Sequence, residues 1–165
     1  MTIIYLGLGS NLNAEENLRC GVRELGRRFE LREVSAVYRN RPVGFEGDDF
    51  LNAVACADTD LSPAAVCKEL EEIHELAGRI RGVEAFESRT LDIDLLLYGQ
   101  DIIEAQHVPR SDILEYSFVL RPLAEIAPGV VHPQTGKTIA THWSEFDAAL
   151  HPLERVPLIL LNGDA

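Results

Sequence analysis

Two aspartates stand two positions apart in the apolar stretch SRTLDIDLLLYG, residues 88–99. Side chains alternate along a β-strand, so Asp92 and Asp94 project from the same face, with Cβ atoms roughly 6.5 Å apart. We expect that face to carry Thr90, Asp92, Asp94, Leu96 and Tyr98, and the opposite, core face to carry Leu91, Ile93, Leu95 and Leu97. Two carboxylates this close repel each other unless a cation lies between them. The spacing therefore predicts either a cation site or a solvated strand edge.

Arginines near this strand favour the cation site. Arg79 and Arg81 precede the strand across a glycine-containing loop, and Arg89 opens it. Mg²⁺ prefers carboxylate, phosphate and water oxygens, and two such ions fit between neighbouring aspartates. Arginine binds phosphate oxygens through two parallel hydrogen bonds. The combination predicts a metal-bound phosphate chain.

A second candidate site lies in the stretch DFLNA, residues 49–53. Phe50 and Asn52 share one face of the expected strand 49–58. If that face is open, Phe50 can stack on a flat heterocycle while the Asn52 amide binds the edge of that ring. The alternative is a core phenylalanine beside an incidental asparagine.

Other motifs carry less chemistry. GLGSNL, residues 7–12, has leucine at the third glycine position of a dinucleotide-binding loop, and no phosphate-binding Gly-Lys-Ser/Thr follows. We interpret it as a tight turn between a strand and a helix. The histidines lack the spacing of a zinc site, and His74 is expected to be a partly buried helix residue.

Composition limits the class of protein. The chain has 165 residues, of which 46% are hydrophobic, and this predicts a single domain over residues 1–165. A net charge of −12 argues against a nucleic-acid or membrane partner. Cys20, Cys56 and Cys67 lack CxxC spacing, no secretory signal is evident, and no apolar run approaches the roughly 20 residues of a membrane span. We expect a cytoplasmic protein; its oligomeric state is left open, with a monomer as one expectation.

The order of expected elements predicts the fold class. Strand 2–8 precedes a helix capped by Asn13 with Glu16 three residues later, and strands 31–39 and 49–58 follow. In the expected strand 31–39, Val34, Ala36 and Tyr38 share a face. The result is an α+β, ferredoxin-like β-α-β-β-α-β arrangement, with an antiparallel sheet, two helices on one face and the other face open.

The second helix and the C-terminal region complete this expectation. Ser62 caps the helix, Pro63 occupies its first turn and Gly78 ends it. Its expected buried stripe is Val66, Leu70, Ile73 and Ala77. The C-terminal helical extension comprises a short helix beginning near Pro122 and a helix over 138–150, and the apolar tail VPLILLN is expected to form an extra strand.

Seven motifs together resemble one enzyme family. They are GLGSNL, YRxxPxG at 38–44, DFLNA, GRIRG at 78–82, SRTLDIDLLLYG, VPR at 108–110 and FxLxPLxEIAP at 118–128. In this order and spacing they resemble the 6-hydroxymethyl-7,8-dihydropterin pyrophosphokinase family over about residues 2–140. The resemblance implies transfer of a pyrophosphoryl group from MgATP to the pterin hydroxymethyl group, with release of AMP, in folate biosynthesis.

The resemblance also implies residue roles. Asp92 and Asp94 would hold two Mg²⁺ ions, and Arg79, Arg81 and Arg89 would neutralise charge on the phosphates. The pterin would lie between Phe50 and Phe118, with Asn52 at its edge and backbone atoms near Val43 completing the pocket. The loops 40–48 and 78–88 would close over the substrates.

The chain departs from the family pattern near the nucleotide. It has Asn40-Arg41-Pro42 where the family usually has Thr-Pro-Pro, Phe86 in place of Trp, Arg110 in place of His, and Tyr116 in place of Arg. Arg110 is expected to serve as a phosphate contact. Two alternatives stay open, a pterin-binding paralogue with weak or no kinase activity and an enzyme acting on another heterocyclic alcohol.

Overall fold

The computed structural model describes residues 1–41, 47–78 and 91–160. The strands are β1 (Thr2–Ser10), β2 (Glu30–Val34), β3 (Val37–Asn40), β4 (Phe50–Thr59), β5 (Asp92–Tyr98) and β6 (Glu154–Val156). The helices are α1 (Ala14–Arg28), α2 (Pro63–Leu76), α3 (Asp112–Glu115), α4 (Ser117–Ile126) and α5 (Ile139–Glu145), and the 3-10 turns are η1 (Glu104–Gln106) and η2 (Ala148–Leu150).

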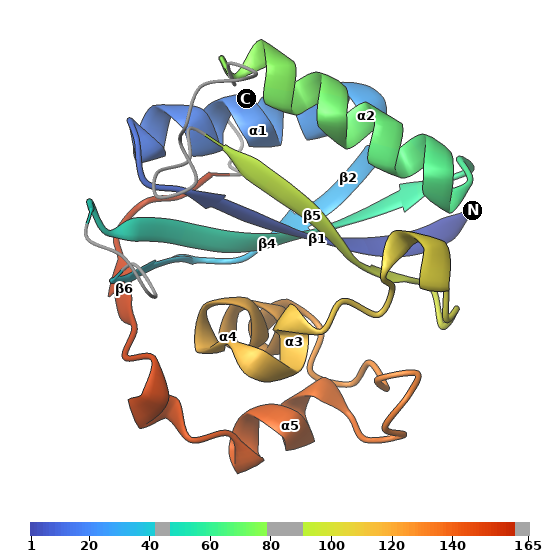
Figure 1. Ribbon diagram of the computed structural model, residues 1–165, viewed down its shortest axis with the longest axis vertical. Helices are drawn as coiled ribbons and strands as arrows, with labels where there is room; N and C mark the ends of the chain where they lie inside the picture. Colours follow the sequence, from blue (N-terminus) through green and yellow to red (C-terminus); the bar gives the residue numbers. More distant parts are fainter. Residues whose placement is uncertain (42–46, 79–90, 161–165) are drawn as a thin grey trace.

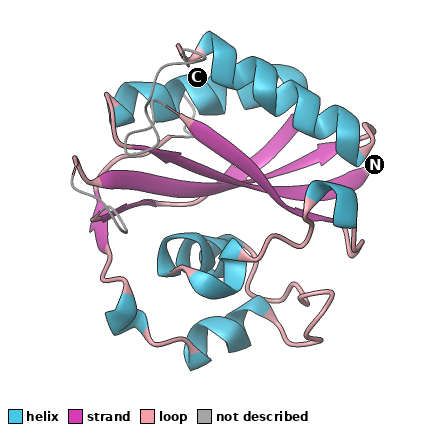
Figure 2. Ribbon diagram, viewed as in Figure 1, coloured by secondary structure: helices cyan, strands magenta, loops and turns pink. Residues whose placement is uncertain are grey.

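All strand pairs in the six-stranded sheet are antiparallel, with the order β5-β1-β4-β3-β6 and β2 paired to β4. The predicted α+β class and antiparallel sheet are confirmed. Helices α1 and α2 cover one face, as expected (Figure 1). The opposite face is not fully open, because α3, α4 and α5 lie beneath it (Figure 2). The C-terminal extension therefore makes a third layer that covers part of the sheet.

Two hydrophobic cores lie on opposite faces of the sheet. The first packs α1 and α2 against the sheet and includes Leu18, Leu25, Val66, Leu70 and Ile73. The second packs α3, α4 and α5 against it and consists of Val54, Leu96, Leu97, Ile113, Leu120, Leu123, Ala127 and Ile139. Because each face of the sheet packs on its own core, the register of the central strands decides which of their side chains point to the side of the second core.

A bulge changes the predicted alternation in β5. The register with β1 runs Leu6 to Leu95 and then Tyr5 to Leu97, so Leu96 is an extra residue. Leu96 and Leu97 consequently both belong to the second core, whereas Tyr98 packs against the first. The expected faces of Leu97 and Tyr98 were wrong, because an inserted residue reverses the alternation beyond it. Asp92 and Asp94 precede the bulge and are unaffected.

The helix starts differ in how well their caps were predicted. Ser62 accepts a hydrogen bond from the backbone of Ala65 at 3.2 Å, and Pro63 opens α2. Asn13 does precede α1, but its φ is 45° and its side chain makes no capping bond. The Asn17 side chain instead donates to the Leu12 carbonyl at 2.6 Å. Asn13 thus acts through its left-handed backbone rather than as the predicted capping box.

The expected strand 31–39 is divided into β2 and β3. At the break, the backbone N–H of Ser35 donates to the Val54 carbonyl at 2.8 Å, and the Ser35 hydroxyl accepts from Val54 N–H at 2.9 Å. Val34 and Val37 both pack on the first core, whereas Tyr38 does not belong to it. The prediction that Val34 and Tyr38 share a face was therefore wrong, because the break shifts the alternation.

The C-terminal elements also differ from the expectations. Helix α4 begins at Ser117 and contains Pro122, so the expected start at Pro122 was wrong. Buried Leu120 and Leu123 hold this helix on the sheet in spite of the missing N–H of Pro122. Helix α5 ends at Glu145 rather than near residue 150. Strand β6 ends at Val156, the first residue of the apolar tail, so the expectation that this tail forms the extra strand was wrong for residues 157–160. Within the described residues, no helix is long and apolar enough to cross a membrane.

Candidate active site

A cavity of about 290 Å³ lies where β1, β4 and β5 meet the start of α4. Five of the predicted site residues line it, namely Phe50, Asn52, Asp92, Asp94 and Phe118. The sequence analysis did not assign the lining residues Gly7, Gly9, Asp112 and Val119 to the site. A volume near the lower end of the usual range for ligand pockets suits a small ring system rather than a whole nucleotide.

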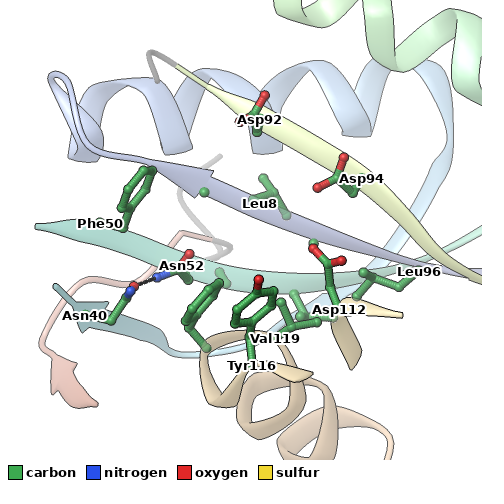
Figure 3. Close-up of a pocket in the computed structure, with 15 residues that line it drawn as sticks. Leu8, Asn40, Phe50, Asn52, Asp92, Asp94, Leu96, Asp112, Tyr116 and Val119 are labelled. Atoms are coloured by element: carbon green, nitrogen blue, oxygen red, sulfur yellow. Dashed lines mark hydrogen bonds between the residues drawn. The ribbon is translucent and has the colours of Figure 1, made fainter. Parts of the chain in front are cut away.

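Asn52 presents a fixed amide to this cavity. Asn52 is 6% exposed, and its Nδ2 donates to Asn40 Oδ1 (Figure 3). The same Nδ2 donates, at 3.5 Å, to the Tyr38 carbonyl. These two acceptors assign the amide orientation, because Oδ1 could not donate to them. The Asn52 Oδ1 is therefore oriented to accept a hydrogen bond from a ligand. Both acceptors of the Asn52 Nδ2 belong to β3, so this strand fixes the position of the amide.

Two glycines of β1 form the floor of the cavity. Gly7 and Gly9 lie inside the strand, so the strand-to-helix turn predicted for residues 7–12 begins only after Ser10. A Cβ added to Gly9 would lie 3.1 Å from Asn52 Oδ1, and one on Gly7 would lie 3.4 Å from the Leu96 side chain. The strand uses glycine here because side chains from its neighbours occupy the space.

The carboxylates lie at the β5 side of the cavity. Asp92 and Asp94 project from β5, while Asp112 projects from α3 across from them (Figure 3). Burial raises the pKa of the Asp94 carboxyl, the nearby Arg110 guanidinium lowers it, and the Asp92 charge raises it again. Asp94 is thus a half-buried acid in an environment that favours a bound cation.

Arg110 supplies a positive charge to these acids. Its Nε lies 3.7 Å from Asp94 Oδ2 and 3.6 Å from Asp112 Oδ2. The Nε atom is buried and has no hydrogen-bond partner among the described residues. The backbone N–H of Arg110 donates to the Leu96 carbonyl at 3.0 Å, which holds this residue beside β5. The Nε of the guanidinium therefore lies close to two carboxylates of the cavity without a hydrogen bond to either.

Comparisons with known proteins identify the family of this chain. The family model of 7,8-dihydro-6-hydroxymethylpterin-pyrophosphokinase (HPPK) matches residues 5–128. The chain belongs to this family. A 2-amino-4-hydroxy-6-hydroxymethyldihydropteridine pyrophosphokinase of Haemophilus influenzae is 37% identical over 141 residues, covering 82% of this chain and 88% of that protein. The enzyme of the same name from Pseudomonas aeruginosa is 33% identical over 162 residues, covering 93% of this chain and 96% of that protein.

Solved structures show the same fold. The HPPK-DHPS protein of Plasmodium falciparum with pteroate matches with a TM-score of 0.74 at 12% identity over 90% of this chain. The chain spans 45% of the length of that protein. The α+β fold is thus that of the HPPK domain. As a member of this family, the chain is a pyrophosphokinase of folate biosynthesis, and the family uses MgATP.

The carboxylates of the cavity fit Mg²⁺. Among the described residues, no group of three or more His, Cys, Asp or Glu side chains is placed to hold a metal ion. Mg²⁺ does not need such a cage, because it is usually bound by one or two carboxylates together with substrate phosphates and water. Asp92 and Asp94, with the raised pKa of Asp94, are such a pair.

His74 supports the backbone between the two aspartates. Its Nε2 accepts a hydrogen bond from the Ile93 backbone N–H at 2.8 Å, and its Nδ1 lies 3.2 Å from Glu71 Oε2. The proton is assigned to Nδ1, because Nε2 accepts. His74 is 6% exposed, so it is a buried helix residue, and its hydrogen bond joins α2 to the stretch of β5 that carries Asp92 and Asp94.

Replacing His74 by leucine should lower the free energy of unfolding by about 1–3 kcal/mol, because the buried Ile93 N–H loses its acceptor. The measurement is urea unfolding of the wild type, His74→Leu and His74→Gln. Glutamine can place an oxygen near the position of Nε2, so we expect it to recover most of the lost stability. Equal losses in the leucine and glutamine variants would contradict this role of the hydrogen bond.

Several predicted residues lie outside the described part of the chain. These are Val43, Arg79, Arg81 and Arg89, together with Phe86 and most of the two loops expected to close over the substrates. Their roles stay predictions. Gly7, Gly9 and Asp112 were missed, although one signal was present in the sequence. Two glycines two positions apart in a strand leave space on a single face.

Proposed function

We propose that the cavity binds the pterin and that the carboxylates at its β5 side bind the magnesium ions of MgATP. The observation that carries this proposal is that Phe50, Asn52 and Phe118 line the same cavity as Asp92 and Asp94. A ring bound by the first group therefore lies next to phosphates bound through the second. This proximity is what pyrophosphoryl transfer between two substrates requires.

The pterin half of the site comes from β4 and α4. Phe50 and Phe118 supply aromatic faces for a flat ring, and Asn52 lies between β3 and the glycine floor. We propose that the pterin lies between the two phenyl rings and donates a hydrogen bond to Asn52 Oδ1. Backbone atoms near Val43 would complete the pocket, as the family resemblance implies.

The phosphate half comes from β5 and the arginines. We propose that Asp92 and Asp94 hold two Mg²⁺ ions, which would neutralise phosphate charge and lower the pKa of the attacking hydroxyl. Arg79, Arg81 and Arg89 would contact the transferred and leaving phosphates. Arg110, whose Nε lies beside Asp94 without a hydrogen bond among the described residues, would turn from the carboxylates to a phosphate oxygen.

The proposed reaction forms one bond and breaks one. The pterin hydroxymethyl oxygen bonds to the β-phosphorus of ATP, the bond from that phosphorus to the oxygen bridging to the α-phosphorus breaks, and AMP leaves with that oxygen. The hydroxyl proton passes to solvent. The side chains of the site align the two substrates and neutralise charge, which is the main source of acceleration in phosphoryl transfer.

An AMP-release assay tests this function. AMP should form from MgATP only when 6-hydroxymethyl-7,8-dihydropterin is present, and its rate should rise further with free Mg²⁺ after all ATP is already in the MgATP form, because a second ion binds. Pterin binding without AMP release would contradict the kinase assignment. Saturation at one Mg²⁺ per ATP would contradict the two-ion site.

Substituting Gly9 by alanine tests the pterin cavity. The new Cβ would lie 3.1 Å from Asn52 Oδ1 and force the amide to shift by a few tenths of an ångström. We expect the KM for the pterin to rise by about tenfold and the KM for ATP to stay unchanged, because small misplacements of a binding group are costly. Steady-state kinetics with each substrate varied in turn will measure both constants.

Gly7→Ala is the matched control for that substitution. The nearest atoms to its Cβ would be those of the flexible Leu96 side chain, at 3.4 Å. The KM for the pterin should therefore change less in Gly7→Ala than in Gly9→Ala. Equal changes in the two variants would show that the position of Asn52 does not govern pterin binding.

Three further properties belong to this proposal. We infer that the protein is cytoplasmic and monomeric and that residues 1–165 form a single domain. Free Cys20, Cys56 and Cys67 suit a reducing compartment. Size-exclusion chromatography with light scattering will measure the oligomeric state.

A further inference from the structure

We propose that residues 151–156 form an outer support for the pterin cavity and that His151 is a positioning residue for Phe118. This segment follows the part of the chain matched by the family model, which ends at residue 128. The proposal rests on the proposed function, because it concerns the pterin that would stack on Phe118. It adds a residue that contacts the wall of the site rather than the substrate.

The aromatic contacts of His151 carry the first step. Its ring centroid lies 5.4 Å from that of Tyr116 and 6.1 Å from that of Phe118, with an edge-on geometry toward Phe118. Tyr116 and Phe118 stack on each other at 4.9 Å, and both line the cavity. His151 does not line that cavity. It packs behind the aromatic wall and limits the positions that the Phe118 ring can adopt.

A hydrogen bond fixes the backbone of the segment to the same wall. The Ser117 hydroxyl donates to the His151 carbonyl, and Ser117 is fully buried at the start of α4. Ser117 stands between Tyr116 and Phe118 in the sequence. The hydrogen bond therefore holds the main chain at His151 next to Ser117, the residue between Tyr116 and Phe118.

The end of the segment pairs with β3, whose residue Asn40 lines the cavity. Strand β6 pairs with β3 in an antiparallel register, and Arg39 forms an ion pair with Glu154 at 2.9 Å. The last residue of β3 is Asn40, which accepts the hydrogen bond from the Asn52 amide. The segment thus connects the aromatic wall of the cavity with the strand that supports the pterin-binding amide.

His151 acts through the packing of its ring. Its Nδ1 is buried and has no hydrogen-bond partner among the described residues. The ring centroid of Phe146, which follows α5, lies 6.5 Å from that of His151. A phenyl ring in place of the imidazole should therefore keep the contacts, whereas a methyl group should lose them.

The test compares His151→Ala, His151→Phe and Leu150→Ala in steady-state kinetics and in pterin binding without ATP. We expect His151→Ala to raise both the KM and the Kd for the pterin by about tenfold, with kcat within about twofold and the KM for ATP unchanged. His151→Phe should return the KM to within about threefold of the wild type. Leu150 precedes the segment, is 65% exposed and does not line the cavity, so it is the control and should have wild-type constants.

Two results would overturn the proposal. One is a fall in melting temperature for His151→Ala with an unchanged KM for the pterin, since the residue would then serve the fold alone. The other is a pterin KM for His151→Phe as high as that for His151→Ala. Phe118→Ala, measured in parallel, separates this proposal from the proposed function. An unchanged pterin KM in Phe118→Ala would place the pterin elsewhere, whereas a raised one leaves only the role of His151 to be decided.

Discussion

Replacing Asp94 by asparagine should lower kcat by about a thousandfold or more while the protein stays folded. Asparagine keeps the size of the side chain but removes the charge that, in the proposed site, binds Mg²⁺. The Asp94 side chain is 41% exposed and lies outside both hydrophobic cores, so its charge does not hold the fold together. Burial and Asp92 even raise the pKa of this carboxyl, which means that its charged form is disfavoured without a cation.

The AMP-release assay and urea unfolding measure the two parts of this prediction. The free energy of unfolding should change by less than about 1 kcal/mol, as at other half-exposed sites. Asp101→Asn is the control, because Asp101 is an exposed acid beyond the end of β5. Near-normal turnover in Asp94→Asn would refute the metal role, and global unfolding would show that the acid is structural.

The sequence predicted the pairing of the two aspartates because alternation in a strand is a local property. It did not predict where the alternation ends. The extra residue Leu96 depends on the register between β5 and β1, which no residue of β5 specifies alone. Leu97 and Tyr98 were therefore assigned to the wrong faces, while Asp92 and Asp94, on the near side of the bulge, were assigned to the same face correctly.

The floor of the cavity was missed for a similar reason. Gly7 and Gly9 suggested a turn, since glycine is common where the chain reverses. In the structure their lack of a side chain makes room for Leu96 and Asn52, which come from the two neighbouring strands. A glycine pair can be interpreted as space for side chains from adjacent strands only when the identity and register of those strands are known.

The third layer was predicted only in part. Apolar spacing indicated helices after β5, but the packing of Leu120 and Leu123 places the start of α4 before Pro122 rather than at it. Asp112 gave no local signal. It joins the site because α3 lies beneath the sheet, where Arg110 Nε is 3.6 Å from Asp112 Oδ2 and 3.7 Å from Asp94 Oδ2. Contacts between the sheet and the helices beneath it thus bring into the site a residue that the local sequence pattern did not indicate.

Replacing Asn52 by leucine should lower kcat/KM for the pterin by about a hundredfold or more, because a pterin donor would be buried without its acceptor. The KM for ATP should change little. Leu51→Ala is the matched control on the same strand, since Leu51 faces the first core and its truncation should lower stability without changing pterin recognition. Kinetics with each substrate varied, and a melting temperature for each variant, will separate the two effects. Wild-type pterin binding by Asn52→Leu would show that this amide does not bind the ring.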